Sequence, residues 1–211
     1  MRLEKRLRLY VITDGRLADE VEGTEKALKG GATAIQLRMK NAPTRKMIEV
    51  GKKLRKLTEE YDALFFVNDR VDVALAVDAD GAHLGQEDMQ IEIAREIAPD
   101  LIFGVSASSV QEALEAEKGG ADYIGAGAVF PTSTKSDAEF LGIDGLQKVV
   151  RRVRIPVVAI GGINHENVLE VLRRGAHGVA VISAIMGAEN IEEATRRMRE
   201  IIDEFFREKE D

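Results

Sequence analysis

Eight short apolar runs alternate with segments of helical periodicity along the chain, and this alternation constrains the fold more than any other feature. The runs are residues 7–13, 32–35, 64–67, 81–84, 101–105, 122–125, 156–160 and 178–181. A Gly-Ala or Gly-Gly-Ala step marks the start of four of them, at residues 30–32, 81–82, 119–121 and 175–176. Short apolar strands separated by helices predict a parallel sheet covered by helices. Eight such units in 211 residues predict an α/β fold of the (β/α)8 TIM-barrel type.

The main alternative is an open, doubly wound sheet. Such a sheet usually carries a Gly-x-Gly-x-x-Gly turn after its first strand, but here that turn is Thr13-Asp14-Gly15-Arg16. The hydrophobic content of 45% is enough for a large core. We therefore expect residues 1–211 to form one (β/α)8 barrel domain.

The composition excludes several kinds of chemistry and partner. The chain has no cysteine, so disulfides, thiolate metal sites and cysteine nucleophiles are excluded. A formal net charge of −7 argues against nonspecific binding to nucleic acid. A charged N-terminus and the lack of a long apolar run argue against a signal peptide or a membrane span, which predicts a cytoplasmic protein. Charged residues at 32%, without cysteine, are typical of heat-adapted proteins.

The stretch Gln36-Leu37-Arg38-Met39-Lys40 lies at the downstream end of the second predicted strand. Side chains alternate across a strand, so Gln36, Arg38 and Lys40 should point one way and Met39 the other. In a (β/α)8 barrel, ligands bind at the carboxyl ends of the strands, where this stretch lies. An amide and two cations on one face predict an anion site, although a solvated strand end is the alternative.

Two carboxylates follow the next two strands. Asn68 and Asp69 come directly after residues 64–67, and Asp88 lies in the loop after residues 81–84. Carboxylates on adjacent loops, among cations, predict a Mg²⁺ ion held by Asp69 and Asp88 together with phosphate oxygens. The alternative for Asp69 is that it caps the next helix.

Hydroxyl groups and glycines follow the later strands. Ser106 comes after the fifth strand, and the hydroxyl-rich loop Pro131-Thr132-Ser133-Thr134-Lys135 comes after the sixth. Gly161-Gly162 and Ile182-Ser183 end the seventh and eighth strands, whose loops often bind phosphate in this fold, and Asn164 is expected to cap the next helix. We expect two anion sites on opposite sides of one barrel mouth, with loop 132–140 as a lid.

The three histidines indicate no catalytic triad or metal centre. His165-Glu166 begins like a zinc-protease helix, but Leu169 stands where the second histidine would be needed. We expect His83 to be a hydrogen-bonded residue of the barrel wall and His177 to lie at the opposite end of the barrel.

Seven motifs in chain order resemble those of the thiamine phosphate synthase family, and the resemblance covers nearly the whole chain. The motifs are Gln36-Leu37-Arg38-Met39-Lys40, Asn68-Asp69-Arg70, His83-Leu84-Gly85-Gln86-Glu87-Asp88, Gly104-Val105-Ser106, Pro131-Thr132-Ser133-Thr134-Lys135, Gly161-Gly162-Ile163 and Val181-Ile182-Ser183-Ala184-Ile185. The resemblance implies a transferase that joins 4-amino-5-hydroxymethyl-2-methylpyrimidine diphosphate to hydroxyethylthiazole phosphate. The reaction would need Mg²⁺ and release pyrophosphate.

The resemblance also implies a role for each matching residue. The pyrimidine diphosphate would be held by Gln36, Leu37, Arg38, Met39, Lys40, Asn68, Ser106 and Lys135. The thiazole phosphate would be held by Thr132, Ser133, Thr134, Gly162, Ile182 and Ser183. The metal ligands would be Asp69 and Asp88, and the catalytic residues would be Arg38, Lys40, Lys135 and Ser106. Departure of pyrophosphate would leave a carbocation-like group that the thiazole nitrogen attacks, so no protein nucleophile is needed.

Two positions depart from the family pattern, and three other functions stay open. Ser108 stands where the family often has histidine, and Met39 replaces a frequent acidic residue. The alternatives are a related barrel that isomerises a thiazole phosphate or regulates, a noncatalytic sensor of a phosphorylated ligand, and a phosphosugar or indole-pathway isomerase. We expect small-molecule substrates and neither nucleic acid nor membrane as a partner, and leave open an assembly of identical copies.

Overall fold

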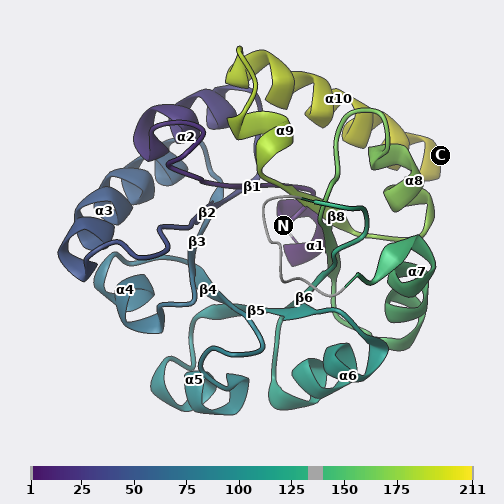
Figure 1. Ribbon diagram of the computed structural model, residues 1–211, viewed down its shortest axis with the longest axis horizontal. Coiled ribbons are helices and arrows are strands. Elements are labelled where there is room, and N and C mark those ends of the chain that lie inside the picture. Colours follow the sequence, from purple (N-terminus) through teal and green to yellow (C-terminus); the bar gives the residue numbers. More distant parts are fainter. Residues whose placement is uncertain (1, 133–139, 211) are drawn as a thin grey trace.

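A computed structural model describes residues 2–132 and 140–210 and shows a closed barrel of eight parallel strands. Each strand pairs with the next, and β8 pairs with β1. The strands are β1 (Leu9–Ile12), β2 (Ala34–Leu37), β3 (Leu64–Asn68), β4 (Gly81–Leu84), β5 (Ile102–Ala107), β6 (Tyr123–Ala126), β7 (Val157–Ile160) and β8 (Gly178–Val181). Figure 1 looks down the barrel and shows the strands as an inner ring with helices around it. The predicted (β/α)8 barrel is confirmed.

In the part of the chain that the structure describes, eight helices cover the outside of the barrel (Figure 1). They are α2 (Glu20–Lys29), α3 (Thr44–Glu60), α4 (Val71–Ala76), α5 (Ile91–Ile97), α6 (Val110–Gly119), α7 (Gly142–Arg152), α8 (Val168–Arg173) and α10 (Ile191–Glu210). Local sequence sets several of their ends. The Asp19 carboxylate caps α2 by accepting the N–H groups of Val21 and Glu22, and Ser109 caps α6 in the same way. No helix within residues 2–132 and 140–210 is long and apolar enough to span a bilayer.

The apolar residues form two separate cores, because successive side chains of each strand face opposite sides of the sheet. The larger core lies between the strands and the outer helices and includes Leu37, Phe65 and Val67. The smaller core fills the barrel and includes Tyr10 and Phe66. The floor of any ligand site at the barrel mouth is therefore made by inward-facing strand residues.

Two four-residue helices were not expected from the sequence. The helix α1 (Leu3–Arg6) precedes β1, which begins at Leu9 and not at the predicted residue 7. In the view of Figure 1, α1 lies within the outline of the ring of strands, and Leu3 packs against the core of the barrel interior, so α1 covers the amino end of the barrel. The helix α9 (Ser183–Met186) lies between β8 and α10.

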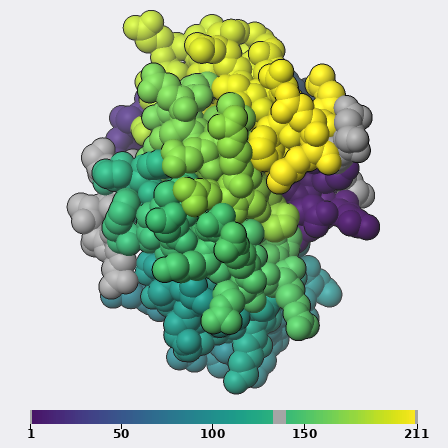
Figure 2. Space-filling view, turned by 90° about the vertical axis from the view of Figure 1, so that its right-hand side faces the viewer, coloured from purple at the N-terminus to yellow at the C-terminus, as the bar shows by residue number. Residues whose placement is uncertain are grey.

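The C-terminal helix α10 completes the outer layer beside the N-terminal segment. Figure 2 shows the yellow end of the chain next to the purple N-terminal residues. The Arg8 guanidinium lies 4.0 Å from the centre of the Phe206 ring, a cation–π contact. Arg199 donates from Nη1 to the Gly31 carbonyl at 2.9 Å. These contacts join α10 to β1 and to the end of α2.

The predicted cap at Asn164 is wrong, because α8 begins later than expected. Its N-cap is Asn167 and its first residue is Val168. The Asn164 Oδ1 atom instead accepts the N–H groups of Glu166 at 2.8 Å and Asn167 at 3.3 Å, which forms a turn before the helix.

Candidate active site

A cavity of about 480 Å³ opens at the carboxyl ends of the strands. This volume is in the range of small-molecule sites. The cavity brings together nine of the predicted site residues, namely Lys40, Asn68, Asp69, Asp88, Ser106, Thr132, Gly162, Ile182 and Ser183. Gln36 and Arg38 line a second, inner cavity of about 20 Å³, large enough for about one water molecule. Asn68 and His83 line both cavities, so the smaller one lies at the floor of the larger.

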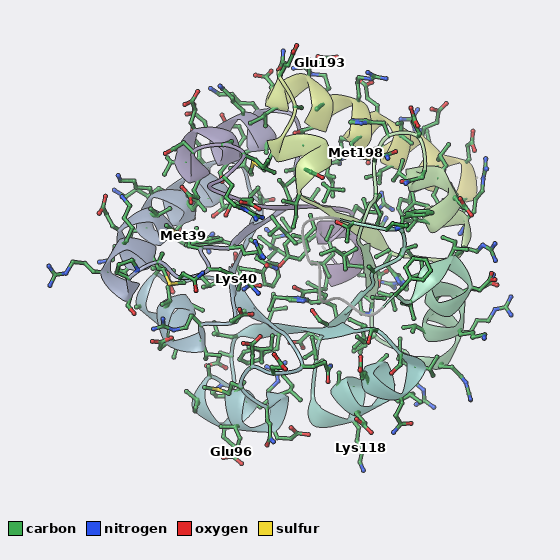
Figure 3. The ribbon with its side chains drawn as sticks, in the orientation of Figure 1. Met39, Lys40, Glu96, Lys118, Glu193 and Met198 are labelled. Carbon is green, nitrogen blue, oxygen red and sulfur yellow. The ribbon has the colours of Figure 1, made fainter. Side chains whose placement is uncertain are left out.

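The predicted donor set begins in β2 and continues into the loop that follows it, because β2 lies two residues later than the predicted strand 32–35. β2 ends at Leu37, so Arg38 and Lys40 belong to the loop that follows. Leu37 lies in the outer core and Met39 packs against it, as the predicted alternation requires. Met39 and Lys40 are labelled in Figure 3, where Lys40 lies nearer the barrel centre. The side chains of Leu37 and Met39 line neither cavity.

Arg38 is a buried cation with spare hydrogen-bonding capacity. Its side chain is only 9% exposed, and within the described chain its Nε has no hydrogen-bond partner. Its Nη1 lies 3.8 Å from Oδ2 of Asp14, which lies in the loop two residues after the end of β1. A buried guanidinium with an unpaired N–H group is costly unless a ligand pairs with it. This arrangement suits an anion in the floor of the cavity.

Asp14 was not predicted as a site residue, although an acidic residue directly after a strand was a visible signal. Its Oδ1 accepts the Nε–H of Arg16 at 2.9 Å. This hydrogen bond is the main cause that holds the pKa of Asp14 below its ordinary value, and Arg38 adds a smaller effect in the same direction. Asp14 therefore stays ionised beside Arg38.

The two predicted metal ligands line one side of the same cavity. Asp69 has a left-handed backbone with a φ of 63°, and its N–H donates to the His83 carbonyl at 2.8 Å. The N-cap of α4 is Arg70, so Asp69 is not that cap. Asp88 Oδ2 accepts the Gly85 N–H at 2.7 Å, which closes the loop after β4. In the described part of the chain, no group of three or more His, Cys, Asp or Glu side chains could hold a metal ion.

The opposite wall of the cavity contains glycines and hydroxyl groups after β6, β7 and β8. Gly161 and Gly162 have φ values of 101° and 63°, and a Cβ on Gly162 would lie 2.6 Å from the Pro131 carbonyl oxygen. Only glycine fits there without strain. Ser183 is exposed and is the first residue of α9. Ser133, Thr134 and Lys135, with most of the predicted lid 132–140, lie outside the described residues.

A row of hydrogen bonds crosses the barrel beneath Ser106. The Ser106 Oγ lies 2.9 Å from His83 Nε2, and His83 Nδ1 lies 3.0 Å from the Tyr123 hydroxyl. The prediction that His83 is a hydrogen-bonded wall residue is confirmed. The Tyr123 hydroxyl lies 3.0 Å from that of Tyr10, which accepts a hydrogen bond from Gln36 Nε2 at 2.9 Å. Tyr10 and Tyr123 were not predicted as site residues, although a tyrosine within an apolar strand is a visible signal, because its buried hydroxyl needs a hydrogen-bond partner.

The remaining predicted positions have structural partners. Ser108 donates to Glu112 Oε2 from its N–H at 2.6 Å and from its hydroxyl at 3.0 Å, and both residues line the larger cavity. His177 Nδ1 accepts the Val157 N–H at 3.1 Å, at the amino ends of β7 and β8 as predicted. His165 Nε2 lies 2.7 Å from the Ala194 carbonyl oxygen.

A closed parallel barrel with a polar cavity at the carboxyl ends of its strands defines the class of (β/α)8-barrel enzymes. A family model described as thiamine monophosphate synthase matches residues 9–185. Over 204 residues, 97% of this chain and 99% of the relative, the sequence is 66% identical to a thiamine-phosphate synthase of Pyrococcus furiosus. Over 207 residues, 98% of this chain and all of the relative, it is 59% identical to one of Methanococcus maripaludis. The chain belongs to the thiamine monophosphate synthase family and is an enzyme of the transferase class.

Solved structures agree with this assignment. A thiamine phosphate pyrophosphorylase from Pyrococcus furiosus superposes with a TM-score of 0.93 at 64% identity, and the match covers 96% of this chain and 98% of that chain. A 3-hexulose-6-phosphate synthase superposes with a TM-score of 0.69 at 19% identity over 92% of this chain and 99% of that chain, which shows a shared fold only.

Proposed function

We propose that this enzyme transfers the 4-amino-2-methylpyrimidinylmethyl group from its diphosphate to the ring nitrogen of hydroxyethylthiazole phosphate. The observation that carries the proposal is one cavity with two differently built walls. Cations and carboxylates lie beyond β2, β3 and β4, while glycines and hydroxyl groups lie beyond β6, β7 and β8. Two phosphorylated substrates can then meet between the walls, and membership of the family supports this pairing of substrates.

The diphosphate would bind at the wall formed by the ends of β2 and β3. Arg38 supplies a buried guanidinium whose Nε–H has no hydrogen-bond partner among the described residues, and Lys40 supplies an exposed ammonium group that lines the larger cavity. Asn68 is also buried and reaches both cavities. Lys135 would add a further cation from the loop after β6. Charge-assisted hydrogen bonds of this kind are about twice as strong as neutral ones.

Asp69 and Asp88 would hold Mg²⁺ beside the diphosphate. Both are carboxylates that line the same cavity as Lys40, and hard oxygen ligands of this type suit Mg²⁺. Among the described residues no group of three or more acidic or histidine side chains could hold a metal ion, so an ion held by these two carboxylates would keep positions for phosphate oxygens and water. When bound, the ion would supply positive charge that stabilises the leaving pyrophosphate.

The thiazole phosphate would bind at the opposite wall. Thr132, Gly162 and Ser183 line this side of the cavity, and Gly162 leaves the backbone uncovered because it has no side chain. Ser133 and Thr134 would add hydroxyl donors, and Ile182 is a mostly buried apolar neighbour. Backbone and hydroxyl donors of this kind are common at phosphate sites of the fold.

The proposed reaction needs no nucleophile from the protein. The bond between the pyrimidinylmethyl carbon and its oxygen breaks, and the electron pair leaves with pyrophosphate. Arg38, Lys40 and Lys135 stabilise that charge, while Ser106 donates a hydrogen bond in the same cavity. The lone pair of the thiazole nitrogen then forms the new carbon–nitrogen bond, so the positive charge moves to the thiazolium ring and no proton is transferred.

The test is to mix both substrates with the protein and to measure thiamine phosphate as its fluorescent thiochrome derivative. We expect product and pyrophosphate in equal amounts, loss of both after chelation of divalent cations, and recovery with Mg²⁺. Binding of both substrates without product at any Mg²⁺ concentration would overturn the proposal and indicate a sensor. Product formation that chelation does not change would overturn the metal assignment alone.

A further inference from the structure

Ser106, which the proposed reaction uses, ends a hydrogen-bonded row whose other members have no role in that reaction; we call the row Gln36–Tyr10–Tyr123–His83–Ser106 the relay. Its residues come from five different strands, in the order β2, β1, β6, β4 and β5. Tyr10 and Tyr123 are almost completely buried, at 1% and 0% exposed. Their rings, with centres 6.1 Å apart, also pack against Phe66. Buried polar groups in such a row must satisfy one another.

Two glycines make room for the relay. A side chain at Gly104 on β5 would overlap the ring of Tyr123. A Cβ at Gly125 on β6 would lie 2.7 Å from the Cε1 atom of His83. Neither glycine has a positive φ, so their missing side chains provide space and not an unusual backbone. The neighbouring strands are therefore shaped around these two rings.

The available donors and acceptors determine which group donates in each hydrogen bond of the relay. Burial raises the pKa of both tyrosines well above the ordinary value, so each hydroxyl keeps one proton to donate. Within the described chain, the Tyr10 hydroxyl has two hydrogen-bond neighbours, Gln36 Nε2 and the Tyr123 hydroxyl. Gln36 donates to Tyr10, so the only acceptor for the Tyr10 proton among the described residues is Tyr123. Tyr123 then donates its own proton to His83 Nδ1.

This direction determines the tautomer of His83. When Nδ1 accepts a hydrogen bond, the neutral imidazole carries its proton on Nε2. Nε2 lies 2.9 Å from Ser106 Oγ, so His83 donates to Ser106. The Ser106 hydroxyl then accepts the hydrogen bond from His83 and keeps its own proton to donate. Ser106 lines the larger cavity, so that proton can reach a ligand there.

We propose that Tyr10 and Tyr123 are positioning residues that hold His83 as its Nε2–H tautomer, so that the Ser106 hydroxyl acts as a hydrogen-bond donor toward the ligand. Ser106 then selects a hydrogen-bond acceptor on the ligand. The identity of that acceptor, an oxygen of the diphosphate, rests on the proposed function, whereas the tautomer does not.

The test of the tautomer uses the protein without substrates. Histidine labelled with ¹⁵N is incorporated, and long-range ¹H–¹⁵N correlation spectra distinguish the two neutral tautomers. The chain has three histidines, so His83→Gln identifies the His83 signals by their loss. We expect His83 to carry its proton on Nε2 in the parent protein. A proton on Nδ1 in the parent would overturn the proposal, even where a variant fails to fold or the parent forms no thiamine phosphate.

Variants test the positioning role. Tyr123→Phe removes the donor to Nδ1, so we expect a mixture of His83 tautomers and a fall in kcat of about tenfold, with the KM for the thiazole phosphate unchanged. Tyr10→Phe leaves the Tyr123 donor in place and should have a smaller effect on the His83 tautomer and on kcat. Tyr61→Phe is the matched control, because this half-buried residue caps α3 outside the relay, and both readouts should match the parent. An unchanged tautomer in folded Tyr123→Phe would overturn the proposal.

Discussion

The Arg38 guanidinium lies 3.8 Å from the Asp14 carboxylate, and these two side chains are only 9% and 4% exposed. Asp14 also has a closer partner, because the Arg16 Nε–H donates to it at 2.9 Å. The buried carboxylate therefore keeps a cation when Arg38 is removed. Loss of Arg38 should then affect the ligand more than the fold.

Arg38→Met tests this separation of roles. We expect kcat/KM for the pyrimidine diphosphate to fall by about a hundredfold, because a buried charge that pairs with the ligand is lost. The free energy of unfolding should change by no more than about 1 kcal/mol, since Asp14 retains Arg16. Steady-state kinetics and denaturant unfolding measure the two effects. Arg16→Met, at a side chain 71% exposed, is the control and should leave turnover near the parent value.

Asp88→Asn tests the proposed metal site while an oxygen remains to accept the Gly85 N–H. We expect turnover to fall by at least about a hundredfold and the Mg²⁺ requirement to rise, because a neutral amide is a poor ligand for Mg²⁺. Binding of the thiazole phosphate, measured by calorimetry, should be nearly unchanged. Asp100→Asn makes the same change in charge before β5, at the opposite end of the barrel, and should behave as the parent. Equal loss of turnover and thiazole phosphate binding in Asp88→Asn would show that the metal loop is misassigned.

Gly162→Ala tests the opposite wall of the cavity. The new Cβ would lie 2.6 Å from the Pro131 carbonyl oxygen at a backbone φ of 63°, so the turn must shift. We expect the KM for the thiazole phosphate to rise about tenfold or more, with a stability loss of about 1–2 kcal/mol. Gly120→Ala also has a positive φ, of 102°, but it ends α6 at the far end of the barrel. The control should lose similar stability without the change in KM.

His177→Asn tests a contribution to pH-dependent stability. Burial lowers the pKa of His177 below its ordinary value of 6.5. Below that ordinary value the unfolded chain binds a proton before the folded chain does, so stability falls as pH decreases from about 7 to about 5. Asparagine can accept the same Val157 N–H, so the variant should lose less stability over this range. Denaturant unfolding at several pH values measures the difference, and an unchanged slope would contradict the assignment.

Arg95→Met tests the contacts that join α5 to the segments just before β5 and β6. Arg95 donates to the Gly120 carbonyl at 2.9 and 3.0 Å and to the Leu101 carbonyl at 2.7 Å, and it pairs with the Asp122 carboxylate. We expect the free energy of unfolding to fall by about 2–3 kcal/mol. Arg95→Lys should have a stability between those of the parent and Arg95→Met, because lysine keeps the charge but lacks the planar guanidinium. Calorimetry measures the stability of both variants.

The same measurement on the parent protein tests the expected heat adaptation. A parent melting temperature within the mesophilic range of about 45–65 °C would count against it.

The positions of the strands could be predicted because burial leaves a local pattern in the sequence. The predicted runs 81–84 and 178–181 coincide with β4 and β8. Other ends differ by one or two residues, as at β1 and β2, because pairing with a neighbouring strand sets where a strand stops. The helices α1 and α9 are four residues long, which is too short for a helical period to be visible.

The grouping of the candidate site residues followed from topology. Parallel strands of a barrel end at the same edge, so Lys40, Asp69, Asp88 and Gly162 line one cavity although they are far apart in sequence. The roles of these residues stay predictions. The partners beneath them could not be derived in this way, because contact across a barrel depends on register and on the shapes of both strands.

The sequence by itself determined the class of fold, the family resemblance and the order of donors around the barrel mouth, because each is encoded in local periodicity or in short motifs. The tertiary structure decided which groups touch beneath that mouth. Tyr10 and Tyr123 are 113 residues apart, and their hydroxyls meet only because the barrel closes and Gly104 leaves room for a ring. The proximity of Arg38 to Asp14 likewise depends on the pairing of β1 with β2. Hydrogen bonds and ion pairs between neighbouring or facing strands have no sequence period, since they depend on distances that exist only after the chain has folded.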